Sequence, residues 1–166
     1  ITVTVNSVTG GKDAIDVRQV GGTGNLAVEA TGLLTATNQH GVFINNTGAG
    51  NVSVTVASVD ANFDGVSANN TNGTLTVNAS GTLNSATRHG VRADSESGGT
   101  TQVISVNNAY GNQSGVFTNH QGTGSSTINV TGSVTGNLQA AIDTNTGSGG
   151  MTIINLNSGA DISSNS

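Results

Sequence analysis

The chain has 166 residues, a formal net charge of −5 and only 8% charged residues. One lysine and three arginines, without a basic cluster, exclude a nucleic-acid or anionic-membrane surface. The absence of cysteine excludes disulfides and thiolate metal sites, and no apolar run is long enough for this segment to insert into a bilayer. Proline is also absent, which suits long stacks of paired strands because a central strand cannot spare a backbone N–H.

Each repeat begins with a strand in which apolar and polar residues alternate, so that one set of side chains points inward and the other outward. These strands are expected at residues 1–5, 26–30, 52–56, 75–79, 103–106, 128–131 and 153–156. A shorter apolar element follows around Val8, Leu33, Val59, Leu83 and Val134. The copy at 103–106 is out of phase with the others, so the pattern leaves the register of residues 102–112 open.

A third strand carries two inward columns of side chains. The first column is Ile15, Val42, Val66, Val91, Val116 and Ile142, at spacings of 27, 24, 25, 25 and 26 residues. The second is Val17, Ile44, Ala68, Ala93, Thr118 and Thr144. Glycine-rich turns close each lap, because glycine adopts a positive φ without steric cost. A fixed period in this range is typical of stacked repeat architectures.

Three short strands per lap, with no helical periodicity, predict an all-β fold: a right-handed parallel β-helix of about 6.5 coils of roughly 25 residues. Left-handed forms usually use hexapeptide repeats and shorter laps. Residues 1–166 form a single β-helix segment, which we expect to be a fragment of a longer solenoid because the chain starts directly in a strand pattern. A β-sandwich would explain the short strands and turns, but not six copies of one motif.

Asparagines share one column of the third strand, interrupted by Arg18 and Asp94. The members of the column are Asn45, Asn69, Asn119 and Asn145. Identical amides one rung apart can hydrogen-bond along the axis, as in cross-β ladders. Asparagine also suits turns because it tolerates left-handed backbone conformations. Both interpretations assign these asparagines a structural role.

A polar column in which acid and imidazole alternate precedes the third strand. It contains Asp13, His40, Asp64, His89, Ser114 and Ala140. On rungs about 5 Å apart the acids would stabilise protonated histidine, so we expect His40 and His89 to have pKa values above the usual value of about 6.5.

The same column resembles half of a hydrolytic triad, with Ser114 as the nucleophile. A straight ladder at a strand start is not a convergent cleft, however, and no oxyanion hole is indicated. We interpret Asp13, His40, Asp64 and His89 as a structural polar ladder, with a metal site as a second interpretation. No catalytic residue, metal ligand or cofactor is assigned.

The outward column of the third strand reads Asp16, Phe43, Ser67, Arg92, Phe117 and Asp143. Asp16 and Asp143 lie five rungs apart, on the order of 25 Å, which is too far for the paired carboxylates of a glycosidase. Exposed aromatics on a rod can mark sugar stacking or protein contact. We therefore expect Phe43, Phe117 and Arg92 to take part in surface contacts, with cover of the two rings by neighbouring loops as the alternative.

Several repeated phrases give the chain a resemblance to passenger-domain segments of bacterial autotransporters and related large surface adhesins. They are Gly50–Val56, His40–Gly48, Val66–Thr74 and Asn129–Gly136. The resemblance is periodic and compositional and extends over nearly the whole chain. It implies a right-handed β-helix displayed outside a Gram-negative cell, cysteine-poor and secreted through a C-terminal outer-membrane barrel. We expect this chain to be a stretch of the stem alone.

These observations favour a structural and adhesive, non-enzymatic module that is extracellular, on the surface of the bacterial outer membrane. Its partners would be host-cell surfaces, glycans or other copies of the chain. The alternative is a carbohydrate-active β-helix, a polysaccharide lyase or tailspike-like hydrolase, which needs clustered carboxylates or a basic catalytic residue in a groove. An ice-binding solenoid would need regular Thr-x-Thr rungs, and this motif occurs once, at Thr2–Thr4.

Overall fold

The computed structural model describes residues 1–96 and 100–165, and all regular elements in these ranges are β-strands. They are β1 (Thr2–Val5), β2 (Val8–Gly10), β3 (Ile15–Gln19), β4 (Leu26–Ala36), β5 (Val42–Asn46), β6 (Val52–Ala61), β7 (Val66–Asn70), β8 (Thr74–Ser85), β9 (Val91–Ser95), β10 (Thr101–Gly111), β11 (Val116–His120), β12 (Ser125–Val130), β13 (Ser133–Gly136), β14 (Ile142–Thr146), β15 (Met151–Leu156) and β16 (Asp161–Ser164). The part of the chain described here contains no helix that could cross a bilayer.

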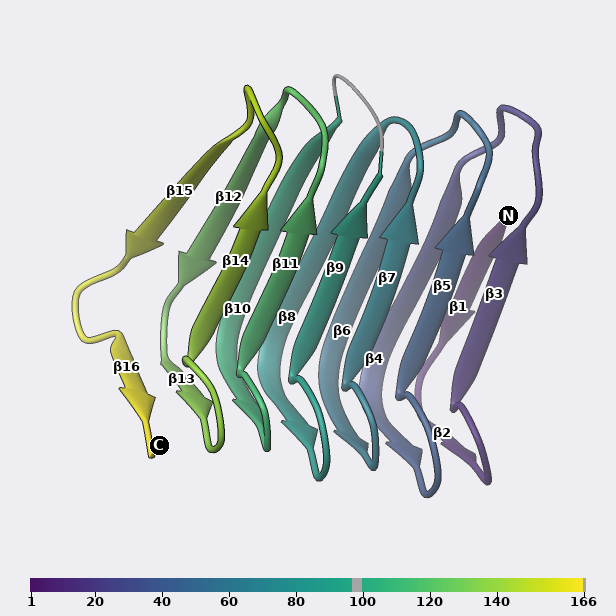
Figure 1. Cartoon of the computed structure of the whole chain (residues 1–166). Helices are drawn as coiled ribbons and strands as arrows, with labels where there is room; N and C mark the ends of the chain where they lie inside the picture. Colours follow the sequence, from purple (N-terminus) through teal and green to yellow (C-terminus); the bar gives the residue numbers. More distant parts are fainter. Residues whose placement is uncertain (97–99, 166) are drawn as a thin grey trace.

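The strands form two parallel sheets that wind into a solenoid of about six turns (Figure 1). The six-stranded sheet has the order β14-β11-β9-β7-β5-β3, and the ten-stranded sheet follows β1-β4-β6-β8-β10-β12-β15, with β2, β13 and β16 beside this path. In Figure 1 the front strands run upward, the rear strands run downward and the chain advances from right to left, so the coil is right-handed. The predicted right-handed parallel β-helix is confirmed.

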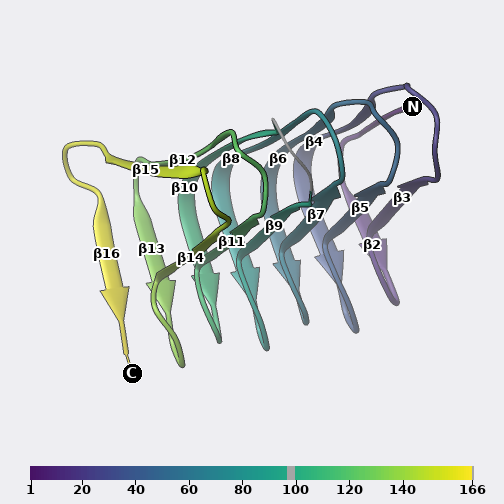
Figure 2. The same cartoon turned by 45° about the horizontal axis from the view of Figure 1, so that its top comes forward.

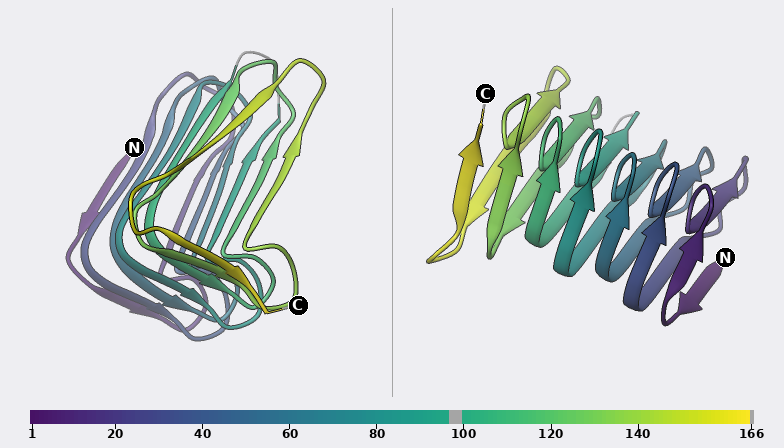
Figure 3. Two further views of the ribbon diagram at one scale, coloured as in Figure 1. Left: turned by 90° about the vertical axis from the view of Figure 1, so that its left-hand side faces the viewer. Right: turned by 90° about the horizontal axis from the view of Figure 1, so that it is seen from below.

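The first two strands of a lap merge into one long bent strand in the central laps. β4, β6, β8 and β10 have this form, whereas the first lap and the last laps keep two separate strands. The view along the coil in Figure 3 and the tilted view in Figure 2 show the bend repeated from lap to lap. The pairing register shifts at the bend, for example between Ala30 and Leu33 on β4, as expected of a β-bulge.

In the first six laps the corners at this bend alternate between two lengths, whereas the last corner, from Ile154 to Ile162, spans eight positions. On β6 the inward residues Val54 and Val59 are five positions apart, whereas on β4 the equivalent residues Val28 and Leu34 are six apart. Each long corner of the first six laps contains a glycine where a Cβ would collide with a side chain of the preceding short corner. These contacts are Gly32 with Ser7, Gly81 with Ser58 and Gly132 with Asn107. Long and short corners therefore fit against each other in pairs.

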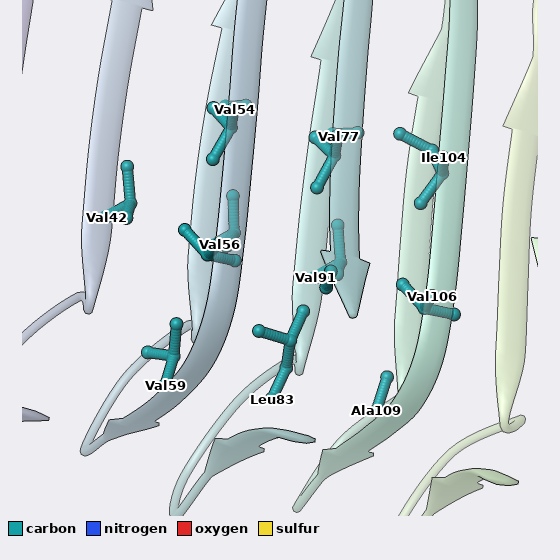
Figure 4. Close-up of a cluster of buried hydrophobic side chains, with 14 of the residues drawn as sticks. Val42, Val54, Val56, Val59, Val77, Leu83, Val91, Ile104, Val106 and Ala109 are labelled. Atoms are coloured by element: carbon teal, nitrogen blue, oxygen red, sulfur yellow. The ribbon is translucent and has the colours of Figure 1, made fainter. Parts of the chain in front are cut away.

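Vertical columns of Val, Ile, Leu and Ala fill the interior, and Figure 4 shows Val54, Val77 and Ile104 in successive laps. Val42 pairs with Val66, and Val66 with Val91. All three valines are buried, with no exposed surface. The register continues through Ile15, Val116 and Ile142, and the second column runs from Val17 to Thr144. Both predicted inward columns of the third strand are confirmed.

The second inward element differs from the prediction at Leu33. Leu34 pairs with Val8 and Val59 and is buried, whereas Leu33 is exposed. The extra residue of the long corner is the cause, because a shift of one position moves a side chain to the other face of a sheet.

The structure gives the register of residues 102–112, which the sequence pattern left open. Ile104 pairs with Val77 and Ile128, so Ile104 points inward and Val103 outward. Gln102 occupies the core position that Leu75 holds in the preceding lap. A polar residue at a core position breaks the apolar alternation on which the prediction depends.

Gln102 belongs to a polar patch inside the C-terminal half of the solenoid. Its amide nitrogen donates to Ser95 Oγ at 2.9 Å, and its Oε1 accepts from Ser126 Oγ at 3.0 Å. Within the described residues, the buried Thr118 hydroxyl and both ring nitrogens of His120 have no hydrogen-bond partner. Buried polar groups without a partner are rare in folded proteins, so this patch interrupts the otherwise apolar interior.

A column of glycines precedes the anchor valines of the central laps, at Gly41, Gly65, Gly90 and Gly115. The backbone of the next rung lies too close for a side chain. A Cβ on Gly65 would lie 2.5 Å from the carbonyl oxygen of Gly90, whereas a Cβ on the exposed Gly11 would meet nothing within 4 Å.

We expect Gly65→Ala to reduce the free energy of unfolding by about 1–3 kcal/mol, because the added methyl group forces neighbouring rungs apart. Gly11→Ala is the matched control and should leave stability unchanged or raise it slightly. Urea unfolding followed by circular dichroism measures both. Equal stability of the two variants would contradict the close approach of the rungs.

Candidate functional site

Most of the ionisable side chains gather on the outer side of the six-stranded sheet, called the charged face below. Of four cationic and nine acidic residues, nine lie in its strands or in the turns just before them. They are Lys12, Asp13, Asp16, Arg18, Asp64, Arg88, Arg92, Asp94 and Asp143. His40, His89, Phe43 and Phe117 lie in the same strands and turns. A face of this composition is the place in the fold where specific polar contacts can form.

Asp64 is the centre of the polar ladder and is fully buried. Its Oδ1 accepts from the backbone N–H of His89 at 3.2 Å, and Oδ2 lies 3.6 Å from Nη1 of Arg88. Oδ2 is also 3.3 Å from Nδ1 of His40, within ion-pair distance but without hydrogen-bond geometry. Asp13 repeats the backbone contact two laps earlier, accepting from the N–H of His40 at 3.0 Å. The ladder thus joins successive rungs through acid side chains and backbone amides.

For His89 the expected direction of the pKa shift is wrong. Burial is the largest influence and lowers the pKa of His89 below its usual value of 6.5. Arg88 and Arg92 act in the same direction, while Asp64 and Asp143 oppose them. The sequence pattern showed the neighbouring acid but not the burial. For His40 the expectation stays a prediction.

Phe43 is half-buried and is covered by two neighbours. The Arg18 guanidinium carbon lies 4.7 Å from the centroid of the Phe43 ring, and the His40 ring lies 5.4 Å away in a tilted arrangement. Arg18 is oriented by Asp16, to which Nε and Nη2 donate at 2.9 and 3.0 Å. We call Asp16, Arg18, His40 and Phe43 the Phe43 cluster.

Phe117 has a similar environment three rungs further along. Its ring stacks on that of His89 with centroids 4.9 Å apart, and the Arg92 guanidinium carbon is 5.7 Å from the Phe117 centroid. Arg92 is oriented by Asp94, whose Oδ2 accepts from Nε at 2.7 Å. These four residues are the Phe117 cluster. Side chains of the sheet, and not loops alone, therefore cover the two phenylalanines.

Sequence reasoning identified Phe43, Phe117 and Arg92 but missed the acids that orient the arginines. The missed signal is the spacing of two residues in Asp16–Arg18 and Arg92–Asp94, because residues i and i+2 lie on the same side of a strand. Arg88 was also missed, since nothing in its local sequence indicates contact with Asp64 in the preceding lap.

The predicted asparagine ladder is found in a different column. Asn46 Nδ2 donates to Asn70 Oδ1 at 3.0 Å, and both side chains point into the solenoid. In the predicted column, no hydrogen bond joins Asn45 to Asn69 among the residues described, and Asn69 instead donates to Glu96. The inward amides also bond within their own laps, because Asn46 Nδ2 donates to the carbonyl of Gly50 and Asn70 Nδ2 to that of Thr74.

The remaining candidates do not converge on one point. Ser114 is buried, and its hydroxyl donates to the amide oxygen Oε1 of Gln139. An amide oxygen is not a general base, so this contact does not activate the hydroxyl as a nucleophile. Asp16 pairs through β3 with Phe43, and Asp143 through β14 with Phe117, which places the acids at opposite ends of the sheet. Residues 1–96 and 100–165 contain no group of three His, Cys, Asp or Glu side chains arranged to hold a metal ion.

A second surface feature is a hollow of about 430 Å³ over the bend of β6, β8 and β10. Its polar lining consists of hydroxyl and amide side chains, among them Thr55, Asn78, Ser105, Asn107 and Thr131. No ionisable residue lines it. The hollow therefore offers no general acid or base.

Comparison with protein-family models, with curated proteins and with solved structures gave no match. The possible role of the charged face must therefore be inferred from its own residues. This face presents oriented arginines, imidazoles and aromatic rings along one side of a rod.

We expect Asp64→Ala to lower the free energy of unfolding by about 1–3 kcal/mol, because the buried N–H of His89 loses its acceptor. The matched control is Asp60→Ala, which removes an exposed carboxylate that accepts from Asn84 at 3.0 Å and should change stability far less. Denaturant titration measures the two effects. Comparable losses in both variants would contradict the role of Asp64 in joining the rungs.

The lowered pKa of His89 predicts a loss of stability in mild acid. The unfolded chain takes up a proton near pH 6.5, whereas the folded chain resists it, so stability is complete above about pH 6.5 and falls as the pH drops through the folded-state pKa. His89→Gln should lose less stability than the wild type between about pH 7.5 and 5. An NMR titration that places His89 above 6.5 would overturn this sign.

Proposed function

We propose that this chain is a structural and adhesive stem module of a secreted, surface-displayed bacterial protein of the autotransporter kind, without enzymatic activity. The observation that carries the proposal is the charged face: a continuous parallel sheet presents the Phe43 and Phe117 clusters at fixed positions along a rod. The cysteine-free, weakly charged composition and the resemblance of the repeated phrases support the same assignment.

The lap-to-lap pairing supports the stem part of the proposal. Each lap contacts only its neighbours, so the array is a linear spacer whose length follows from the number of laps. At about 4.8 Å per rung, the five steps from β3 to β14 span roughly 24 Å. Backbone hydrogen bonds at every rung keep such a spacer stiff.

The side chains of the charged face support the adhesive part. Arginine and aromatic residues are enriched where proteins contact one another. Asp16 and Asp94 already hold Arg18 and Arg92 in place, which reduces the entropy lost when a partner binds. The guanidinium groups suit carboxylate groups of proteins or acidic sugars, so host-cell surfaces and glycans are the partners we propose.

The carbohydrate-cleaving alternative has less support. A general acid must reach the substrate, yet Asp64 is fully buried and held by the rung beyond it. The carboxylates of Asp16 and Asp143 lie on rungs about 24 Å apart, far beyond the roughly 10 Å limit for a glycosidase pair.

Beads coated with the chain test the adhesive function on cultured epithelial cells and on a glycan array. Replacing Phe43, Arg92 and Phe117 together with threonine should reduce binding at least about tenfold, equivalent to the roughly 1.4 kcal/mol or more that such contacts contribute. The matched control carries Ser53→Thr, Thr76→Ser and Thr127→Ser on the outer side of the ten-stranded sheet, and its binding should be unchanged. Equal binding by both variants, with circular dichroism showing intact folds, would refute the proposal.

A further inference from the structure

The hollow over the bend of β6, β8 and β10 differs in chemistry from the charged face. Its volume of about 430 Å³ lies within the range of about 300–1,000 Å³ that is typical of sites for small molecules. Three of its polar side chains, Thr55, Asn78 and Ser105, lie at paired positions of successive laps. Together with Thr131 of the following lap they extend over three rung steps, roughly 14 Å. The hollow therefore follows the axis of the rod.

Several polar groups of this lining are available to a ligand. The side chains of Thr55, Asn78 and Ser80 are exposed, and none of them forms a hydrogen bond within the described residues. A hydroxyl group both donates and accepts, and the asparagine amide offers N–H donors and an acceptor oxygen. The hydroxyl groups of a sugar have the same mixed capacity, so hydrogen bonds can form between them and the lining in both directions.

Charge separates the classes of ligand that the hollow can take. No ionisable residue lines it, so a charged ligand would lose hydration without gaining a counter-ion. Glu29 pairs with Thr55 from the preceding lap and is exposed. Its carboxylate would repel a carboxylate, sulfate or phosphate group that binds beside Thr55. The lining therefore favours uncharged ligands, in contrast to the arginines of the charged face.

The backbone and the apolar residues of the hollow do not favour a peptide. β6, β8 and β10 are each paired on both sides by neighbouring strands, so a peptide finds no free strand edge. The apolar lining residues Val56, Ala79 and Val106 are buried, and no aromatic residue lines the hollow. An apolar anchor of a protein partner would therefore gain little contact. Recognition depends on the hydroxyl and amide side chains.

We propose that this hollow binds an uncharged oligosaccharide that lies along the rod axis. Thr55, Asn78 and Ser80 form the hydrogen bonds with the sugar hydroxyl groups. Because no aromatic ring supplies stacking, the dissociation constant should be on the order of 1 mM. The site is separate from the charged face and goes beyond the function proposed above, so either proposal can fail without the other.

NMR titration at low ionic strength tests the site, because weak binding can be followed at each backbone amide. The probes are three uncharged tetramers, maltotetraose, cellotetraose and chitotetraose, and the acidic tetramer tetragalacturonate. At least one uncharged tetramer should shift the amide signals of Thr55, Asn78 and Ser105 in a saturable way, and tetragalacturonate should bind several-fold more weakly. No saturable shift at these residues with any uncharged tetramer, or equal binding of the acidic tetramer, would overturn the proposal.

The variant Asn78→Val removes the central amide and introduces a residue that suits an exposed strand position. The affinity for the uncharged tetramer should fall about tenfold, because the amide donors and acceptor are lost from the centre of the hollow. The matched control is Thr76→Val, which lies on the outer side of the same strand but outside the lining, and it should bind like the wild type. Equal affinities of the two folded variants would contradict the site.

A second variant, Glu29→Gln, tests the role of charge. Removing the carboxylate should abolish most of the difference in affinity between tetragalacturonate and the uncharged tetramer, because the repulsion beside Thr55 is lost. The affinity for the uncharged tetramer should stay the same. An unchanged affinity for tetragalacturonate would contradict the exclusion of anionic ligands that the proposal requires.

Discussion

Parallel backbone pairing between successive laps is the constraint on which the rest of this structure depends. It places residues about one period apart directly above one another, so each position of the lap becomes a column with one environment. Inward columns must then be apolar or able to hydrogen-bond along the axis. The small side chains of the core and the absence of proline both follow from this repetition.

The same constraint organises the charged face. Because Asp64 accepts from the backbone of His89 in the following lap, a ladder residue contributes to rung packing and also fixes where neighbouring arginines lie. Arg88 contacts Asp64, and Arg92 extends over Phe117 of the following rung. Stability and surface chemistry are therefore linked at this face: the groups that orient the exposed side chains also hold the laps together.

The sequence predicted those features that depend on periodicity alone. The stack of Val42, Val66 and Val91 and the right-handed coil of about 25 residues follow from the spacing of one motif. Features that depend on a local change of length or polarity were not predictable in this way. Leu33 was misplaced because the corner of its lap has an extra residue, and the strand beginning at Thr101 was left without a register because Gln102 interrupts an apolar column. At the site, the sequence showed acid next to imidazole, but the pKa of His89 depends on burial, which no spacing reveals.

The alternation of corner lengths has a consequence for how this fold can grow or shrink. Since Gly32, Gly81 and Gly132 each fit beside a shorter corner, the building block of the first six laps comprises two laps, or about fifty residues, although the hydrophobic pattern repeats after half that length. Duplication or deletion of such a double unit preserves every corner contact. A change by a single lap would place two corners of equal length together and leave either a clash or a gap at the seam.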